Sequence, residues 1–242
     1  MTPPTVLVVD LQNDFLDANA GGRGKLCKGF GLPATRRLLK HARANRWPII
    51  HIATVHEGPE TIPIRLRGRS PVYCMRGSGG EGLIAGLRDE EELIIRKQQF
   101  SAFDGTDLTR ILESTSSVVL AGIAADCCIL HTAFDAAGQG KEVYIPYQAI
   151  GAAGPDEFLA GLVTLNKSAA FVGDLRDLLK SGQSALKESI PEADFRARLR
   201  AWFDGGAAAL KKVEAGGPGA QAIPVDQAIR LLEQQLGEFC DT

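Results

Sequence analysis

The stretch "SVVLAGIAADCCILHTAFDA", Ser117 to Ala136, begins as an apolar run and continues as a segment with helical periodicity. The apolar run is rich in β-branched residues, which is typical of a strand buried on both faces. A buried strand that leads directly into a helix is the repeating unit of a parallel α/β sheet. Two adjacent cysteines, Cys127 and Cys128, stand at the junction, where such sheets bind their ligands.

The same alternation recurs along the first 175 residues. Further strands are predicted at 5–10, 48–54, 92–97, 142–147 and 169–172, in addition to 117–123. Helices are predicted at about 33–46, 106–114, 127–139, 155–166 and 174–181. Right-handed crossovers between these elements give an α/β fold: a Rossmann-like, doubly wound sheet of about six parallel strands in a three-layer αβα arrangement.

Two segments depart from this alternation. Residues 55–91 are rich in Gly, Pro and Arg and too long for a plain connection, so we expect them to arch over the site. After about residue 183 the sequence predicts two amphipathic helices around a Gly/Pro linker at 216–219. We therefore divide the chain into a main domain, 1–182, and a helical C-terminal extension, 183–242. The apolar stripes of the extension are predicted to pack on the domain or on a second subunit, and they comprise Phe195, Leu199, Trp202 and Phe203, then Ile229, Leu232, Leu236 and Phe239.

The composition excludes several classes of protein. The chain has 242 residues, a net charge of −2 and 45% apolar residues, so it lacks the basic bias of a nucleic-acid binder. No stretch reaches the roughly 18 apolar residues of a membrane span, and Asp10 comes too early for a secretory signal. Five cysteines are too sparse for a disulfide framework. We expect a cytoplasmic protein with free thiols, no membrane contact and a small-molecule substrate.

Reactive side chains follow three of the predicted strands: Asp10, Lys97 and the Cys127–Cys128 pair. Taken singly, each has an ordinary structural explanation as a turn cap, a surface charge or a small buried residue. Because the ends of neighbouring parallel strands meet at one crevice, the three together suggest a base, a tuning charge and a nucleophile.

A thiol must lose its proton to attack, and an unperturbed cysteine is mostly protonated at neutral pH. The first turn of a helix favours the thiolate, and its unpaired N–H groups can also hold an oxyanion. We predict that Asp126 is the N-cap of this helix, which places both cysteines in the first turn.

Four segments resemble the signatures of the isochorismatase-like cysteine hydrolases, which include nicotinamidases, N-carbamoylsarcosine amidohydrolases, biuret hydrolases and ureidoacrylate hydrolases. They are "VVDLQNDF" (8–15), "RGS" followed by Gly79 (76–79), "KQQFSAFDGT" (97–106) and "AGIAADCCILHTAFDA" (121–136). The resemblance spans roughly residues 5–175 in the same order and leaves out the C-terminal extension.

The resemblance implies roles for named residues. Asp10 would be the general base, Lys97 the charge that stabilises the thiolate, and Cys128 the nucleophile, with Cys127 at the variable position of the motif. It also implies a cis peptide at Ile123–Ala124 and an oxyanion hole formed by the N–H groups of Ala124 and Cys128. The family commonly forms homo-oligomers, so a dimer or tetramer is expected.

Three departures from the family pattern narrow the expectation. Nicotinamidases carry a D-x-H metal motif after the second strand, whereas "ATVHEGPE" (53–60) has Thr54 in place of the aspartate and a single His56. We therefore expect neither a metal nor a cofactor, and interpret His51 as a core histidine and His56 as a loop residue. True isochorismatases typically lack the cysteine, which favours acyl transfer here. Gln148 stands where relatives commonly have Asp, with no function assigned.

The preferred hypothesis is a metal-independent cysteine hydrolase that cleaves a C–N bond of a small amide, carbamoyl or lactam substrate through a Cys128 thioester. Phe15 and Phe103, which adjoin catalytic segments, are candidate pocket walls. Two alternatives remain: hydrolysis of an isochorismate-like vinyl ether, and a non-catalytic scaffold that binds a partner through its helical tail. Substrate identity is not encoded in any residue pattern that we can interpret.

Overall fold

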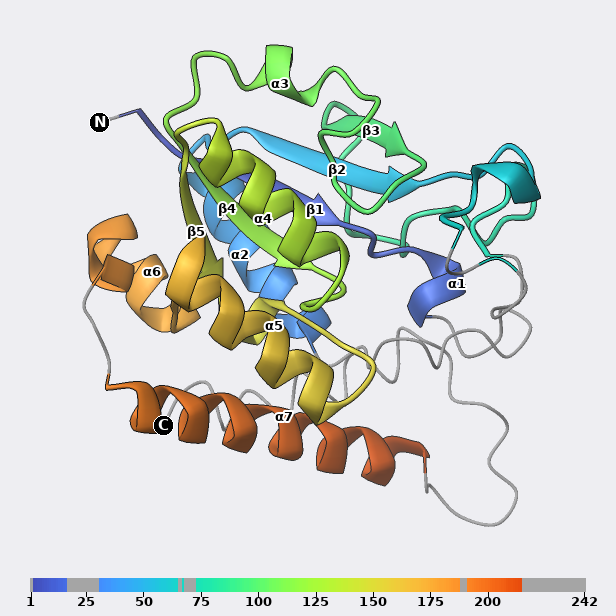
Figure 1. Ribbon diagram of the computed structural model, residues 1–242. Coiled ribbons are helices and arrows are strands. Elements are labelled where there is room, and N and C mark those ends of the chain that lie inside the picture. The colour runs from blue at the N-terminus through green and yellow to red at the C-terminus, as the bar shows by residue number, and fades with distance from the viewer. Residues whose placement is uncertain (1, 17–30, 65–66, 68–72, 188–190, 215–242) are drawn as a thin grey trace.

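Six apolar segments form one parallel sheet in a computed structural model that describes residues 2–16, 31–64, 67, 73–187 and 191–214 (Figure 1). The strands are β1 (Thr5–Val9), β2 (Ile49–Thr54), β3 (Leu93–Lys97), β4 (Ser117–Gly122), β5 (Glu142–Pro146) and β6 (Phe171–Gly173). Their order across the sheet is β3-β2-β1-β4-β5-β6, and all neighbouring strands run parallel. The predicted α/β fold is confirmed.

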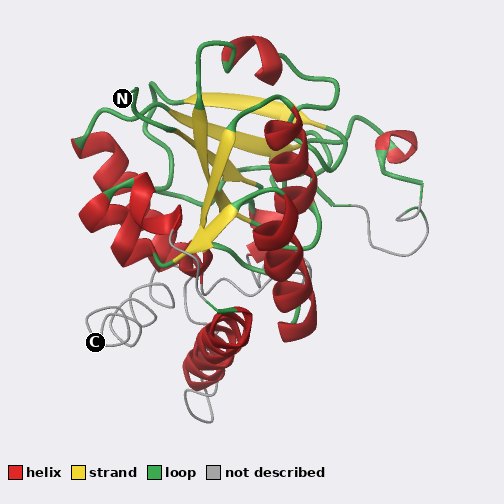
Figure 2. Cartoon of the chain, turned by 60° about the vertical axis from the view of Figure 1, so that its left-hand side comes forward, coloured by secondary structure: helices red, strands yellow, loops and turns green. Residues whose placement is uncertain are grey.

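Helices cover both faces of the sheet, as the alternation of its side chains requires (Figure 2). Val6 and Val8 of β1 belong to the cluster formed with α2 and α6, whereas Leu7 and Val9 belong to the cluster formed with α4 and α5. The α-helices are α1 (Asn13–Leu16), α2 (Leu32–Ala44), α3 (Leu108–Ile111), α4 (Cys128–Gly138), α5 (Pro155–Ser168), α6 (Leu175–Ser181) and α7 (Glu192–Glu214). Short 3-10 helices are η2 (Pro59–Thr61), η3 (Tyr147–Ala149) and η4 (Gln183–Lys187).

One predicted helix is much shorter than expected. The segment 106–114 forms only the single turn of α3. The N–H groups of Glu113 and Thr115 bond three residues back, to the carbonyls of Arg110 and Leu112, and so close separate turns instead of extending the helix.

The first helix of the C-terminal extension packs on the main domain. Phe195, Leu199 and Phe203 of α7 are buried in the same core cluster as Phe158 of α5. The rings of Phe158 and Phe203 lie 5.2 Å apart. The first predicted stripe is thus confirmed as a packing surface, whereas the second (Ile229, Leu232, Leu236 and Phe239) lies outside the described residues. The division at residue 182 stays a prediction.

The strand order changes direction between β1 and β4, in the middle of the sheet. After β1 the chain moves outward through β2 and β3, and it then returns to the other side of β1 as β4. In doubly wound sheets this switch point opens a crevice at the carboxyl ends of the strands. Asp10 and the cysteine pair follow β1 and β4, and therefore flank that crevice. In the described ranges no helix has the length and apolar character needed to cross a membrane.

Candidate active site

Asp10 lies directly after β1, in a left-handed conformation with φ of 54°. Its side chain is buried, and Oδ1 accepts hydrogen bonds from the backbone N–H of Thr54 (3.1 Å) and from its hydroxyl (3.0 Å). The carboxylate is therefore held from the neighbouring strand β2. Its second oxygen, Oδ2, has no partner within the described residues other than the Lys97 ammonium, and it can still accept a proton.

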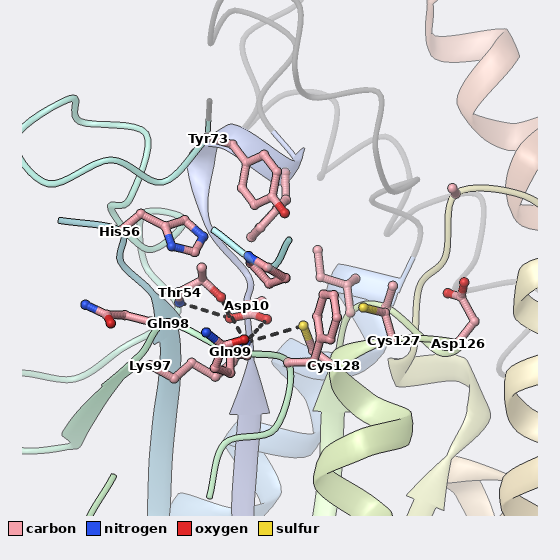
Figure 3. Close-up of a pocket in the computed structure, with 16 residues that line it drawn as sticks. Asp10, Thr54, His56, Tyr73, Lys97, Gln98, Gln99, Asp126, Cys127 and Cys128 are labelled. Carbon is pink, nitrogen blue, oxygen red and sulfur yellow. Dashed lines mark hydrogen bonds and ion pairs between the residues drawn. The ribbon is translucent and has the colours of Figure 1, made fainter. Parts of the chain in front are cut away.

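Lys97, the last residue of β3, connects the other groups of the site (Figure 3). Its Nζ forms an ion pair with Asp10 Oδ2 at 2.8 Å and donates to Cys128 Sγ at 3.3 Å. It also donates to Thr54 Oγ1 (2.9 Å) and to the carbonyl of Gln99 (3.0 Å). Burial alone would lower the pKa of Lys97, but Asp10 and Cys128 raise it above its ordinary value, so the ammonium is retained.

Thr54 and Gln12 fix the positions of these two charges, and neither was predicted as a site residue from the sequence. The Thr54 hydroxyl lies between Asp10 and Lys97, while its backbone N–H also donates to Gln12 Oε1 at 2.8 Å. Gln12 Nε2 returns a bond to the Thr54 carbonyl, again at 2.8 Å. The sequence signal that could have identified Thr54 as a site residue is its position at the end of β2, the strand between β1 and β3.

Cys128 begins α4, and the predicted N-cap is wrong by one residue. Cys127, not Asp126, occupies the N-cap position, since its carbonyl accepts the His131 N–H at 2.9 Å. No side chain caps this helix, and Asp126 is exposed. Figure 3 shows Asp126 beyond Cys127, away from the group formed by Asp10, Lys97 and Cys128.

The surroundings of Cys128 keep its thiol protonated at rest. A hydrogen bond with the Cys127 side chain, burial and the nearby Asp10 carboxylate raise the pKa of Cys128 well above its ordinary value, while Lys97 opposes them. The influences predicted from the sequence were only those that favour the thiolate. The arrangement instead suits a thiol that transfers its proton as it attacks, with Asp10 as the nearby acceptor.

Two backbone N–H groups near the thiol have no acceptor among the described residues. The Ile123–Ala124 peptide is cis, as the resemblance implied. Within the described residues, no hydrogen bond is donated by the N–H of Ala124 or by that of Cys128, although both residues line the pocket. Free N–H groups next to a thiol are donors of the kind that an oxyanion requires.

These groups open into a pocket of about 200 Å³. This volume lies below the roughly 300–1,000 Å³ typical of sites for drug-sized ligands, so a small substrate fits best. Phe15, Tyr73 and Phe100 supply aromatic walls. Phe103, expected as a wall, is instead buried in the core and lines a neighbouring surface groove.

The long segment 55–91 contributes His56, Pro63 and Tyr73 to the pocket lining. His56 lies in the connection between β2 and η2, as expected of a loop residue, but it is only 1% exposed and borders the pocket. His51 is a buried sheet histidine, as expected, and its Nε2 lies 2.9 Å from Glu92. Gln148 lies outside the pocket lining and accepts the Leu175 N–H at the start of α6.

The side chains around His56 do not fit a metal site of the nicotinamidase kind. Within the described ranges, no group of three or more His, Cys, Asp or Glu side chains is arranged to hold a metal ion. Thr54, at the position of the aspartate ligand, uses its hydroxyl on Asp10 and Lys97. His56 alone is too few ligands for a site of three or four.

Comparison of the chain with known proteins identifies its family. Residues 4–177 match the isochorismatase domain, which is more than half of the chain. The chain belongs to the isochorismatase family. A protein of Arabidopsis thaliana named probable inactive nicotinamidase is 30% identical over 172 residues, covering 66% of this chain and 86% of the relative.

Solved structures of family members share the fold. An isochorismatase family protein from Desulfovibrio vulgaris is 24% identical, with a TM-score of 0.65 over 74% of this chain and 97% of that one. N-carbamoylsarcosine amidase from Thermoplasma acidophilum is 25% identical, with a TM-score of 0.61 over 72% of this chain and 97% of the other. These comparisons support a hydrolase with the three-layer α/β fold.

A glycine in α5, Gly161, packs closely against the loop that carries the two free N–H groups. A Cβ at Gly161 would lie 2.4 Å from the Ala125 carbonyl oxygen, so Gly161→Ala must displace this loop. We expect the free energy of unfolding to fall by about 1–3 kcal/mol in urea titrations, and turnover to fall as well. Gly138→Ala is the control, because its Cβ would meet nothing within 4 Å. Equal stability of the two variants would contradict this expectation.

Proposed function

We propose that this isochorismatase-family protein is a metal-independent cysteine hydrolase that cleaves a C–N bond of a small amide, carbamoyl or lactam substrate. The observation that carries the proposal is the position of Lys97 Nζ, 2.8 Å from Asp10 Oδ2 and 3.3 Å from Cys128 Sγ. A base and a thiol that both contact one cation, in the lining of a pocket, are the parts of a nucleophilic acyl-transfer site.

In the first half-reaction the Cys128 thiol attacks the substrate carbonyl and its proton passes to Asp10 Oδ2. The electrons of the C=O bond move to oxygen, and the N–H groups of Ala124 and Cys128 hold the oxyanion. When the intermediate collapses, the C–N bond breaks and Asp10 returns the proton to the leaving nitrogen. The products are a free amine and a Cys128 thioester.

In the second half-reaction water replaces the amine. Asp10 accepts a proton from water as the oxygen attacks the thioester, and the same N–H groups hold the second oxyanion. The C–S bond then breaks, Cys128 recovers its proton from Asp10, and the carboxylic or carbamic acid leaves. Lys97 remains an ammonium throughout, pairing with Asp10 and offsetting negative charge on sulfur.

The relative with "inactive" in its name makes a non-catalytic scaffold the second candidate. Against it stands the burial of an intact Asp10–Lys97 pair, with side chains 1% exposed, in contact with a thiol. Buried charges are costly to maintain and contribute little to stability relative to apolar residues. A scaffold would have no need of this arrangement in the lining of a pocket.

The direct test is to incubate the full chain with a panel of small amides, ureas and lactams and to follow both products and intact mass. The proposal expects release of amine or ammonia, and a transient mass increase that maps to Cys128. If no member of the panel is turned over and none labels Cys128, the scaffold hypothesis is preferred.

Two chemical treatments separate a thiol mechanism from a metal mechanism. Turnover is expected to survive EDTA and to be lost on alkylation with iodoacetamide. Because the pKa of Cys128 is raised above its ordinary value of 9.0, the rate of alkylation should still be rising above pH 9. A requirement for added zinc or iron after EDTA treatment would contradict the proposed mechanism.

A further inference from the structure

His56 lines the pocket and carries a buried nitrogen without a hydrogen-bond partner among the described residues. It follows β2, two residues beyond Thr54, and its ring packs edge-on against Tyr73 with centroids 5.8 Å apart. Its side chain is 1% exposed, and Nε2 has no hydrogen-bond partner within the described residues. In Figure 3 the ring lies across the pocket from Cys128, on the side away from the nucleophile.

The hydrogen bonds on the other side of the ring determine its tautomer. His56 Nδ1 lies 3.1 Å from the Thr61 hydroxyl oxygen, which itself donates to the Gly58 carbonyl at 2.8 Å. A hydroxyl has a single proton to donate, so the Thr61 oxygen must be the acceptor toward Nδ1. The proton of a neutral His56 therefore resides on Nδ1, and Nε2 presents a lone pair.

The charges around His56 keep the ring neutral. Burial and the nearby Lys97 ammonium lower the pKa of His56, while Asp10 and a hydrogen bond with the Thr61 backbone raise it with smaller effect. A neutral ring with Nδ1–H has one acceptor at Nε2 and no proton there to donate. A substrate that fills this pocket must satisfy that acceptor or leave it buried without a partner.

We propose that His56 Nε2 accepts a hydrogen bond from an N–H or O–H group on the part of the substrate that lies away from the scissile carbonyl. This inference rests on the proposed function and names its substrate class: ureides, carbamoyl compounds and carboxamides with a distal N–H. A substrate with a bare acceptor there, such as a pyridine nitrogen, places two lone pairs against each other. Sites that bind a donor reject analogues lacking it, because a buried polar group is left unpaired.

Two amides of the same shape test this specificity. Pyrrole-3-carboxamide carries a ring N–H where furan-3-carboxamide carries a ring oxygen. Their affinities are measured by titration calorimetry on the full chain with Cys128→Ser, so that binding is read without turnover. We expect the pyrrole to bind about tenfold more tightly, the value of one hydrogen bond.

His56→Phe in the same background keeps an aromatic ring at this position and removes the acceptor nitrogen. The preference for the pyrrole should therefore disappear. His41→Gln, in helix α2 and away from the pocket, is the matched control and should retain it. Equal affinities for the two amides, no binding of the pyrrole at millimolar concentration, or a preference that survives His56→Phe would each overturn the proposal.

A second measurement does not depend on any variant of His56. Long-range ¹H–¹⁵N spectra of the wild-type chain distinguish the two imidazole tautomers, and Nδ1–H is expected for His56. An Nε2–H tautomer would overturn the proposal by itself. Selective binding of the pyrrole without turnover of any amide would contradict the proposed hydrolase and leave the donor-specific pocket standing, so the two failures are distinguishable.

Discussion

Cys128→Ser is expected to lower kcat/KM by about a thousandfold or more, with little change in the free energy of unfolding. The serine hydroxyl is a far weaker acid than a thiol, and the Asp10 carboxylate is too weak a base to activate it. Removal of a nucleophile from a working triad typically costs several orders of magnitude. Steady-state kinetics on the best substrate of the panel measures kcat/KM, and urea denaturation measures the free energy of unfolding.

Cys127→Ser is the matched control, because it makes the same replacement of sulfur by oxygen one residue earlier. Cys127 is the N-cap of α4 and lines the pocket, but Lys97 donates to Cys128 and not to its neighbour. We expect Cys127→Ser to retain most of the turnover. Equal loss of activity at both positions would contradict the assignment of the nucleophile.

The parts of the site that sequence could predict are those that depend on strand ends. Asp10, Lys97 and Cys128 lie at or just beyond β1, β3 and β4, and a parallel sheet brings such ends to one edge whatever the details of packing. The apolar runs were equally informative, because strands buried on both faces leave an almost continuous hydrophobic signal. The strand order, which the structure supplies, places β1 beside β4.

The parts that sequence missed depend on side-chain direction and on single hydrogen bonds. Phe100 and Phe103 are equally apolar and three residues apart, yet only Phe100 faces the pocket. His56 does lie in a loop, but its burial was missed because nothing in its sequence neighbours reveals that residues 74–76 pair with it. The helix start moved from Asp126 to Cys127 because the backbone turn there leaves the aspartate in solvent, where no side-chain cap forms.

Lys97→Met is expected to lower kcat/KM about a thousandfold or more and also to destabilise the fold. The variant removes the only ammonium among the described groups that contact Asp10, and it leaves a carboxylate that is 1% exposed without a counter-charge. Breaking a buried pair by removing one partner typically costs about 3–5 kcal/mol. Urea denaturation should show the midpoint falling at an unchanged m-value.

The double variant Asp10→Asn/Lys97→Met separates the two effects. Both partners are then neutral, and the amide oxygen of the introduced asparagine can accept the hydrogen bonds that Thr54 donates, so much of the lost stability should return. Turnover should not return, since neither the base nor the cation is present. If the double variant is as unstable as Lys97→Met, the cost lies in packing around the lysine stem rather than in the orphaned charge. If Lys97→Met alone keeps its turnover, the ion pair serves the fold and not the reaction.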